Sequence, residues 1–278
     1  MCSIDILLAT YNGERYVREL IQSILAQTYT GWRLMVHDDS SSDATMVIVE
    51  EFRRNNPEKI FIINDGISFG SAKRNFQHLL QISRSQYVMF CDQDDVWMDK
   101  KIEVSLDAMM AAEKAYVDVP IIVHTDLEVV DQNLDIISPS MFWSQRLRKN
   151  SKDKNLLFFV NNITGCTMLI NKKAAELGHC MPEEAIMHDW WIGLKTLQAG
   201  GSVAFVDLPT IRYRQHQSNT IGHQKYGLRH VGGKIFNLGL TIENIVSVYR
   251  QARAAGMKMP FVMWVAIKAY YSINRLFY

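Results

Sequence analysis

The 278-residue sequence predicts an α/β fold in which a mostly parallel, Rossmann-like sheet is flanked by helices and followed by a C-terminal helical tail. Two observations carry this prediction. Short apolar runs alternate along the chain with segments of helical periodicity, and each run ends in a polar loop. The length favours one compact unit with an appendage over two large domains joined by a linker.

The first half of the chain alternates strands and helices in a regular order. Strands are expected at 4–9, 34–36, 60–63 and 87–91, with helices at 16–25, 46–52 and 71–82 between them. In such parallel sheets the ligand site lies beyond the carboxyl ends of the strands. The loops that begin at Thr10, Asp38 and Asp92 should therefore meet there.

The second half is less regular. A helix is expected from Asp99 to about Lys114, a strand at 121–125, a polar segment at 145–155 and a strand at 167–170. A helix should follow His188, with strands near Val203 and Ile211, and we place a boundary near Thr220. These limits predict a unit at 1–220, divided into halves at 1–115 and 116–220, and a helical tail at 221–278.

Charge, cysteine spacing and the N-terminal residues argue against several classes of protein. A formal net charge of +1 gives no bulk attraction to nucleic acid. The cysteines form no C-x-x-C pair, which indicates neither a zinc site nor a disulfide framework; they are Cys2, Cys91, Cys166 and Cys180. The N-terminus lacks the basic start and apolar run of a signal peptide, so a cytoplasmic location is expected.

The stretch 260–278 is apolar and aromatic, but Lys268 and Arg275 argue against a membrane-spanning helix. Read as a helix, it places Lys268, Ser272 and Arg275 on one narrow stripe, with apolar side chains over much of the rest. Such a helix suits peripheral contact with the inner face of the cytoplasmic membrane. Docking on the rest of the chain, or on a second copy in a homodimer, is an equal alternative.

The strongest chemical signal is the acidic cluster at 92–97. Asp92, Asp94 and Asp95 follow a buried strand, where like charges repel unless a cation compensates them. Asp92 and Asp94 point to the same side if strand geometry persists, and their oxygens suit Mg²⁺ or Mn²⁺. A solvated acidic turn or a helix cap is the alternative.

Two further loops end neighbouring strands. The residues 10–14 are small and polar, so this loop can approach a ligand closely. After the second strand, Asp39 can accept hydrogen bonds from a base or a ribose. Ser42 and Asp43 are better explained as caps of the following helix.

Together these three loops resemble the donor half of family-2 glycosyltransferases, which have the GT-A fold. The resemblance implies an enzyme that binds a nucleotide-sugar and a divalent metal ion, Mg²⁺ or Mn²⁺. It also implies that the metal lies on Asp94 and Asp92. The residues that would hold the nucleotide-sugar are Thr10, Tyr11, Asn12, Glu14, Asp39, Arg74 and Asp92. For Arg74, a surface charge on a helix is an equal alternative.

The acceptor half matches the same family in order, at 162–167, 188–191 and 213–216. The resemblance makes Asp189 the catalytic base that takes the acceptor proton, with a helix cap as the alternative. His188 stands where the family usually has Glu, which leaves its role open. The residues implied near the acceptor are Thr164, Gly165, His188, Trp190 and Trp191. At least one tryptophan is expected in the core.

Two late residues complete the resemblance, which covers about residues 3 to 220. His216 resembles a histidine that completes the metal site, and Arg214 could neutralise the leaving phosphates. The segment 213–219 is similar to bacterial rhamnosyltransferase-like members, which implies dTDP-rhamnose as donor and a lipid-linked or oligosaccharide acceptor in surface polysaccharide synthesis. A UDP-hexose donor such as UDP-glucose or UDP-galactose, and a non-catalytic nucleotide-sugar or glycan-binding subunit, are the alternatives.

Overall fold

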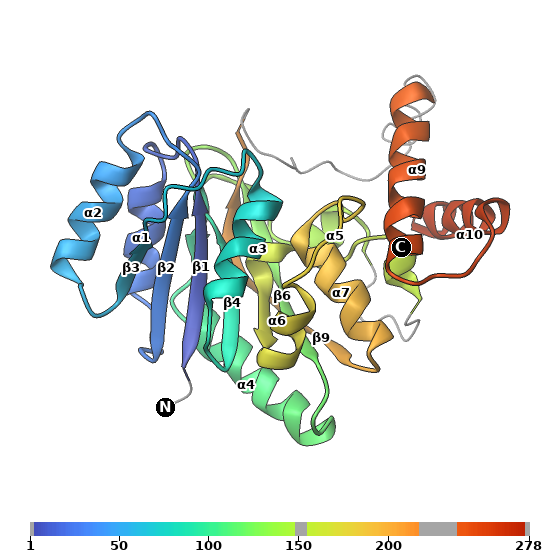
Figure 1. Ribbon diagram of the computed structural model, residues 1–278, viewed down its shortest axis with the longest axis horizontal. Coiled ribbons are helices and arrows are strands. Elements are labelled where there is room, and N and C mark those ends of the chain that lie inside the picture. The colour runs from blue at the N-terminus through green and yellow to red at the C-terminus, as the bar shows by residue number, and fades with distance from the viewer. Residues whose placement is uncertain (1–2, 148–154, 217–237, 276–278) are drawn as a thin grey trace.

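The computed structural model describes residues 3–147, 155–216 and 238–275. Within these residues the central feature is a nine-stranded sheet of order β3-β2-β1-β4-β8-β6-β9-β5, with β7 paired to β6. Helices cover both faces of the sheet, and two C-terminal helices lie at one end (Figure 1). The predicted α/β class with a flanked central sheet is confirmed.

The first half of the sheet is wholly parallel, as predicted. Its strands pair in the order β3-β2-β1-β4, and β1 lies between β2 and β4. Strand β1 is apolar nearly throughout because helices cover both of its faces. The elements are β1 (Ile4–Thr10), α1 (Val17–Leu25), β2 (Trp32–Asp38), α2 (Thr45–Asn55), β3 (Ile60–Ile63), α3 (Ala72–Ile82) and β4 (Tyr87–Asp92).

The second half is mixed. Strand β8 runs antiparallel to both β4 and β6. Strand β9 is parallel to β6, and β5 is antiparallel to β9. The elements are β5 (Val96–Trp97), α4 (Lys101–Ala115), β6 (Ile121–Val130), β7 (Ile136–Ser138), α5 (Met141–Ser144), β8 (Met168–Asn171), α6 (Lys172–Leu177), α7 (His188–Gln198) and β9 (Ser202–Arg214).

One expectation for this half needs correction, and another concerns residues outside those that the structure describes. The two strands expected near Val203 and Ile211 are one strand, β9, whose register against β6 shifts on both sides of Asp126. The local irregularity interrupts the alternation that marks a strand in sequence. The boundary expected near Thr220 lies outside the described residues.

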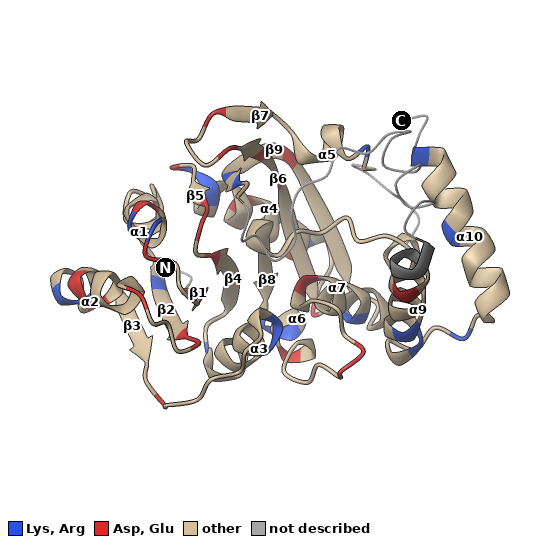
Figure 2. Ribbon diagram, turned by 90° about the horizontal axis from the view of Figure 1, so that it is seen from above, with Lys and Arg blue, Asp and Glu red and all other residues tan. Residues whose placement is uncertain are grey.

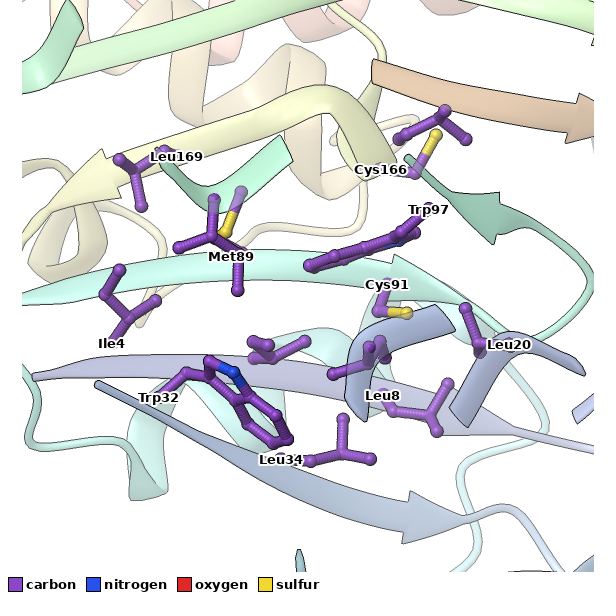
Figure 3. Packing of buried hydrophobic residues seen from close by; sticks show 14 of the residues in the cluster. Ile4, Leu8, Leu20, Trp32, Leu34, Met89, Cys91, Trp97, Cys166 and Leu169 are labelled. Carbon is purple, nitrogen blue, oxygen red and sulfur yellow. The ribbon is translucent and has the colours of Figure 1, made fainter. Parts of the chain in front are cut away.

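The core has one layer on each face of the sheet. Helices α1, α2 and α4 pack on one face, and α3, α6 and α7 on the other. Figure 3 shows part of the first layer, where Cys91, Trp97 and Cys166 lie among aliphatic side chains. Both of these cysteines are buried and unpaired.

The tail forms α9 (Leu238–Ala254) and α10 (Phe261–Asn274). The polar stripe predicted on α10 faces the rest of the chain: Lys268 Nζ donates to the carbonyl of Phe159 over 2.6 Å, and Arg275 donates to the carbonyl of Gln145. Trp264 is fully buried and donates to the carbonyl of Phe158 over 3.0 Å. Of the helices in the described part of the chain, none has the length and hydropathy needed to span a membrane.

Candidate active site

Three loops meet at the carboxyl ends of β1, β2 and β4, as predicted. Asp38 joins the first two: its Oδ1 accepts from the Thr10 hydroxyl over 2.7 Å, and its Oδ2 accepts from the Ser41 backbone over 2.7 Å. The Asp39 N–H donates to the carbonyl of Thr10 over 2.8 Å. The ends of these two strands therefore form one rigid edge.

The third loop is attached to the first through Gln93, a residue to which sequence reasoning assigned no role. Its Oε1 accepts from the Tyr11 N–H over 2.9 Å and its Nε2 donates to the Tyr11 carbonyl over 2.8 Å. The Tyr11 side chain is left 58% exposed at the mouth of the site. A Cβ on Gly13 would collide with the Gln93 amide, so glycine is needed for this close approach.

Asn12 and Glu14 hold the loop that follows β2. Asn12 Oδ1 accepts from the Ser42 N–H over 2.9 Å, and Glu14 Oε2 accepts from the Ala44 N–H over 2.8 Å at the start of α2. The cap of this helix thus comes partly from Glu14, while Asp43 accepts from the Thr45 N–H. Both predicted nucleotide-binding residues have protein partners and position the loop.

Asp39 is buried and holds the loop before α3. Its Oδ1 accepts from Ser68 Oγ over 2.8 Å and from the Phe69 N–H, and its Oδ2 accepts from the Ser71 N–H over 3.1 Å. Burial favours the neutral carboxyl, but these hydrogen bonds outweigh it and hold the pKa of Asp39 below its ordinary value. Oδ2 accepts only one of these bonds, which leaves it capacity for a ligand donor.

Arg74 lies at the surface of α3. Its guanidinium pairs with Glu183, and the two side chains are 50% and 80% exposed. An exposed pair of this kind contributes about 0.2–1 kcal/mol. Arg74 also lines a cavity of about 290 Å³ beside α3, whose lining includes neither Asp94 nor Asp189. The structure thus keeps Arg74 on the surface, away from the acidic cluster.

The acidic segment between β4 and β5 lies at the same edge of the sheet (Figure 2). Asp94 Oδ2 lies 2.7 Å from His216 Nε2, so the structure brings together two of the predicted metal ligands. The His216 ring stacks on Tyr16, with ring centroids 5.0 Å apart. Burial, then the charge of Asp94, then that of Asp189 raise the pKa of Asp92 to about 7.

The cluster continues inward to Asp95 and to Lys101, and sequence reasoning assigned no role to Lys101. Asp95 is fully buried and accepts from the Arg214 N–H over 3.2 Å, and burial raises the pKa of its carboxyl well above the ordinary value. Lys101 is also fully buried, and its ammonium lies over the Trp97 ring. Burial lowers the pKa of Lys101 to about 8. Only the fold reveals this cation beneath the acids.

Arg214 corrects one prediction. Its guanidinium donates to the carbonyls of Asp94 and Gln132, over 2.9 and 2.6 Å, and pairs with Glu19 at 2.5 Å. The side chain is 3% exposed and lies over the Tyr16 ring. Its burial and these three partners argue against direct contact with leaving phosphates. The guanidinium instead fixes the backbone of the acidic cluster.

Asp189 occupies the first turn of α7 and is buried. Its Oδ2 accepts from the Gly165 N–H over 3.1 Å and approaches the Asn161 amide at 3.5 Å, and its Oδ1 accepts from the Trp190 N–H over 2.6 Å. Burial raises the pKa of Asp189 to about 6, although these hydrogen bonds oppose the rise. A carboxyl with this pKa suits a base that operates near neutral pH.

His188 and Trp191 both lie in the core. His188 is buried between Phe76 and Phe90, at centroid distances of 4.4 and 4.6 Å, and its ring nitrogens have no hydrogen-bond partner among the described residues. Burial lowers the pKa of His188 to about 3, so it is a neutral core residue. Trp191 is 4% exposed and also packs in the core, which confirms the expectation that at least one tryptophan lies there. The burial of both side chains argues against the acceptor contacts implied for them.

The remaining predicted acceptor residues lie beside Asp189. Trp190 is half-buried and donates to the carbonyl of Leu157 over 2.6 Å. A Cβ on Gly165 would lie 2.7 Å from His188 Nε2, so glycine lets this turn close against α7. The half-buried Thr164 accepts from the Thr167 N–H through its carbonyl over 2.9 Å.

The fold and this site define a class of protein. A parallel nucleotide-binding half, an acidic cluster at its carboxyl edge and a buried carboxylate in a mixed second half define a glycosyltransferase with the GT-A fold. The chain belongs to glycosyl transferase family 2, whose family model matches residues 5–178.

Similar proteins agree with this assignment. The dTDP-rhamnosyl transferase RfbG of Shigella flexneri is 29% identical over 231 residues, which cover 77% of this chain and 73% of that protein. The UDP-Glc:alpha-D-GlcNAc-diphosphoundecaprenol beta-1,3-glucosyltransferase WfgD of Escherichia coli is 28% identical over 151 residues, 53% of this chain and 55% of that protein. This chain thus matches little more than half the length of WfgD.

The fold also matches solved structures. The crystal structure of S. aureus TarS 1–349 in complex with UDP superposes with a TM-score of 0.64 at 18% identity and covers 99% of this chain and 72% of that one. The complex of the same protein with UDP-GlcNAc gives a TM-score of 0.61 at 17% identity. The predicted GT-A fold is confirmed by this similarity.

Proposed function

We propose that the chain is an inverting, metal-dependent hexosyltransferase of bacterial surface polysaccharide synthesis. Its proposed donor is dTDP-rhamnose, and its acceptor is a hydroxyl of a lipid-linked or oligosaccharide glycan. The similarity to RfbG, over 77% of the chain, supports this donor. The observation that carries the proposed chemistry is the position of Asp189, which is close enough to Asp92 for its charge to raise that residue's pKa.

Asp189 is the proposed base. It removes the proton of the acceptor hydroxyl while the acceptor oxygen forms a bond to the anomeric carbon and the bond from that carbon to the diphosphate oxygen breaks. Attack from the side opposite the leaving group inverts the configuration, and the proton stays on the Asp189 carboxyl. The Gly165 N–H and the Asn161 amide hold that carboxyl in place.

The proposed metal ligands are Asp94, Asp92 and His216. The residues fit a divalent cation because Asp94 is close enough to Asp92 for its charge to raise the pKa of Asp92, and the His216 imidazole lies 2.7 Å from Asp94. Mg²⁺ or Mn²⁺ bound there would stabilise the charge that develops on the leaving diphosphate. Arg214 holds the Asp94 carbonyl, and Asp39 and Tyr11 line the nucleotide side.

A panel of donors tests the function. Purified protein would be incubated with dTDP-rhamnose, UDP-glucose, UDP-galactose, UDP-N-acetylglucosamine or GDP-mannose, with Mn²⁺ or Mg²⁺ and a lipid-linked acceptor, and released nucleoside diphosphate would be measured. Release of dTDP that is lost in Asp94→Asn supports the proposal. Asp118→Asn, which changes an exposed acid that pairs with Lys173, is the matched control and should keep full activity.

The other outcomes separate the alternatives. Release of UDP would assign a UDP-hexose donor, which the similarity to WfgD favours. Metal-dependent binding of a donor without turnover, even with acceptor present, would identify a non-catalytic binding subunit. If the protein neither bound nor turned over any of the donors, that result would contradict the proposal as a whole.

We also propose that α10 contacts the membrane peripherally. Its inner stripe docks on the chain, while its outer side chains are exposed and apolar: Phe261, Val262, Met263, Tyr270 and Ile273. Flotation with anionic vesicles tests this, with Val262→Ser/Ile273→Ser expected to weaken binding and Val47→Ser, on α2, expected to have no effect. A dimer in solution that the double variant dissociates, without vesicle binding, would instead assign this face to a homodimer.

A further inference from the structure

A second group of metal-binding side chains lies behind the donor edge, apart from the acidic cluster. His37 lies in β2, Asp65 in the loop after β3, and His78 in α3. One ligand atom from each lies within 4.8 Å of the others. His37 Nε2 is 3.3 Å from Asp65 Oδ1, and His78 Nε2 is 2.6 Å from Asp65 Oδ2.

The second nitrogen of His37 fixes the state of its ring. Asn75 Nδ2 donates to the His37 carbonyl over 3.2 Å, which orients the amide so that its Oδ1 faces His37 Nδ1 at 2.9 Å. An amide oxygen only accepts, so Nδ1 must carry the hydrogen. In neutral His37, Nε2 therefore presents a lone pair to Asp65.

Two acceptors then face each other across 3.3 Å, with His37 buried and the Asp65 side chain 29% exposed. The hydrogen bond from the Ile67 N–H is the main cause that holds the pKa of Asp65 below its ordinary value, so Asp65 is ionised and offers no proton. His37 is 1% exposed, so water can reach the contact only from the Asp65 side. A cation between the two atoms, or a second proton on His37, would remove the repulsion.

We propose that His37, Asp65 and His78 bind a Zn²⁺ ion. Two imidazoles and one carboxylate form a ligand set that zinc favours over Mg²⁺, and the hydrogen bond from His37 Nδ1 to Asn75 is the outer contact that ligating histidines usually make. A tetrahedron with bonds of about 2.1 Å has edges of about 3.4 Å, close to the separation of His37 from Asp65.

The site would stabilise the donor edge. His37 directly precedes Asp38 and Asp39, and the Phe69 ring packs on both His37 and His78, at centroid distances of 5.6 and 5.1 Å. The Phe69 N–H in turn donates to Asp39. A zinc ion joining β2, α3 and the intervening loop would therefore hold the segment that positions Asp39. This role is structural and independent of the transfer reaction.

Zinc binding to the whole protein tests the proposal. Chelator-treated protein would be titrated with Zn²⁺, and with Co²⁺ as a spectroscopic probe of tetrahedral geometry. His78→Gln and Asp65→Asn are the test variants because both side chains are partly exposed, so folding should tolerate the changes. Each is expected to lose one equivalent of zinc, or to bind it at least tenfold more weakly, and to lose the rise in Tm that zinc gives the wild type.

Two control variants distinguish this site from the others. Asp94→Asn alters the acidic cluster, and Cys166→Ser alters a second group of possible ligands formed with Asp92 and Asp95. Both are expected to keep the equivalent that His78→Gln loses. Zinc binding that persists unchanged in His78→Gln and Asp65→Asn would overturn the proposal, as would a wild-type protein that binds no zinc. In either case a protonated His37 paired with Asp65 would explain the contact.

Discussion

His216 Nε2 lies 2.7 Å from Asp94 Oδ2, although 122 residues separate the two in sequence. The contact brings the end of β9 onto the acidic segment after β4. Tyr16 stacks on the face of the imidazole and limits how the ring can turn. Imidazole and carboxylate are thereby held as neighbours before any ligand arrives.

This arrangement predicts unequal effects for its two members. Asp94→Asn keeps the volume and removes the charge, and should lower kcat/KM by about 100-fold or more, since metal stabilisation of the transition state is worth several kcal/mol. His216→Gln should cost less, about tenfold, and raise the metal concentration needed for half-maximal rate. Rates measured against Mn²⁺ concentration check both. Equal activity in Asp94→Asn and wild type would contradict a catalytic role for a metal ion bound by Asp94.

The second prediction concerns pH. Because burial raises the pKa of Asp189 to about 6, the carboxylate needed as a base is depleted as pH falls through that value. The rate with saturating substrates should fall about tenfold for each pH unit below about 6, and Asp189→Asn should lose the rate at every pH. A profile that stays flat from pH 7 to pH 5 would rule Asp189 out.

The third prediction is that Asp189→Asn is more stable than the wild type at pH 7 to 8. A carboxyl whose folded pKa is raised favours folding below its unfolded pKa of about 4, and this contribution is lost as pH rises through about 6. Asn remains neutral, so the variant should gain about 1–2 kcal/mol at pH 8 and nothing at pH 4. Thermal unfolding at both pH values measures it, and a lower stability at pH 8 would contradict it.

The fourth prediction separates positioning from charge at Arg214. Lysine keeps the charge but cannot reach all three acceptors, so Arg214→Lys should destabilise the fold by about 1–3 kcal/mol and lower kcat. Glu19→Gln, which alters only the 53% exposed partner, is the matched variant and should cost under about 1 kcal/mol. Denaturant unfolding compares them. Equal losses would show that the two carbonyl contacts contribute nothing.

The fifth prediction concerns Gly13 and Gln93. Gly13→Ala places a Cβ against the Gln93 amide and should disrupt its two bonds to Tyr11, with donor KM raised about tenfold. Gln93→Ala removes both the collision and the bonds. The double variant should therefore be no worse than Gln93→Ala alone, a departure from additivity that a double-mutant cycle measures. Additive losses would show that Gly13→Ala does not act through the Gln93 amide.

The sequence predicts best where one local pattern determines the element. All seven strands and helices from β1 to β4 lie where apolar runs and helical periodicity indicate, because each is a parallel strand or the crossover helix that follows one. Strands β5 and β7 are only two and three residues long, and no periodicity marks so short an element. The shift in register near Asp126 likewise hides the length of β9.

The residues of the candidate site also differ in how well the sequence predicts their surroundings. Sequence motifs point to Asp94, Asp189 and His216, and the fold places these residues in the acidic cluster or beside a buried turn. They are less informative for Arg214 and His188, because residue type shows the charge or the ring but not the partners of either side chain. Only tertiary structure shows that the guanidinium is used by backbone carbonyls and that the imidazole lies between two phenylalanines.

Helix α10 presents two sides that can be altered independently. Lys268 and Trp264 donate hydrogen bonds to the carbonyls of Phe159 and Phe158. These carbonyls lie two and three residues before Asn161, whose amide approaches Asp189. Removing the whole helix would remove the hydrogen bonds to those carbonyls, and would thereby also disturb the position of Asp189. Surface exchanges such as Val262→Ser leave them paired. Changes intended to make this protein easier to crystallise should therefore substitute the exposed apolar side chains of α10 and keep the side chains that face the rest of the chain.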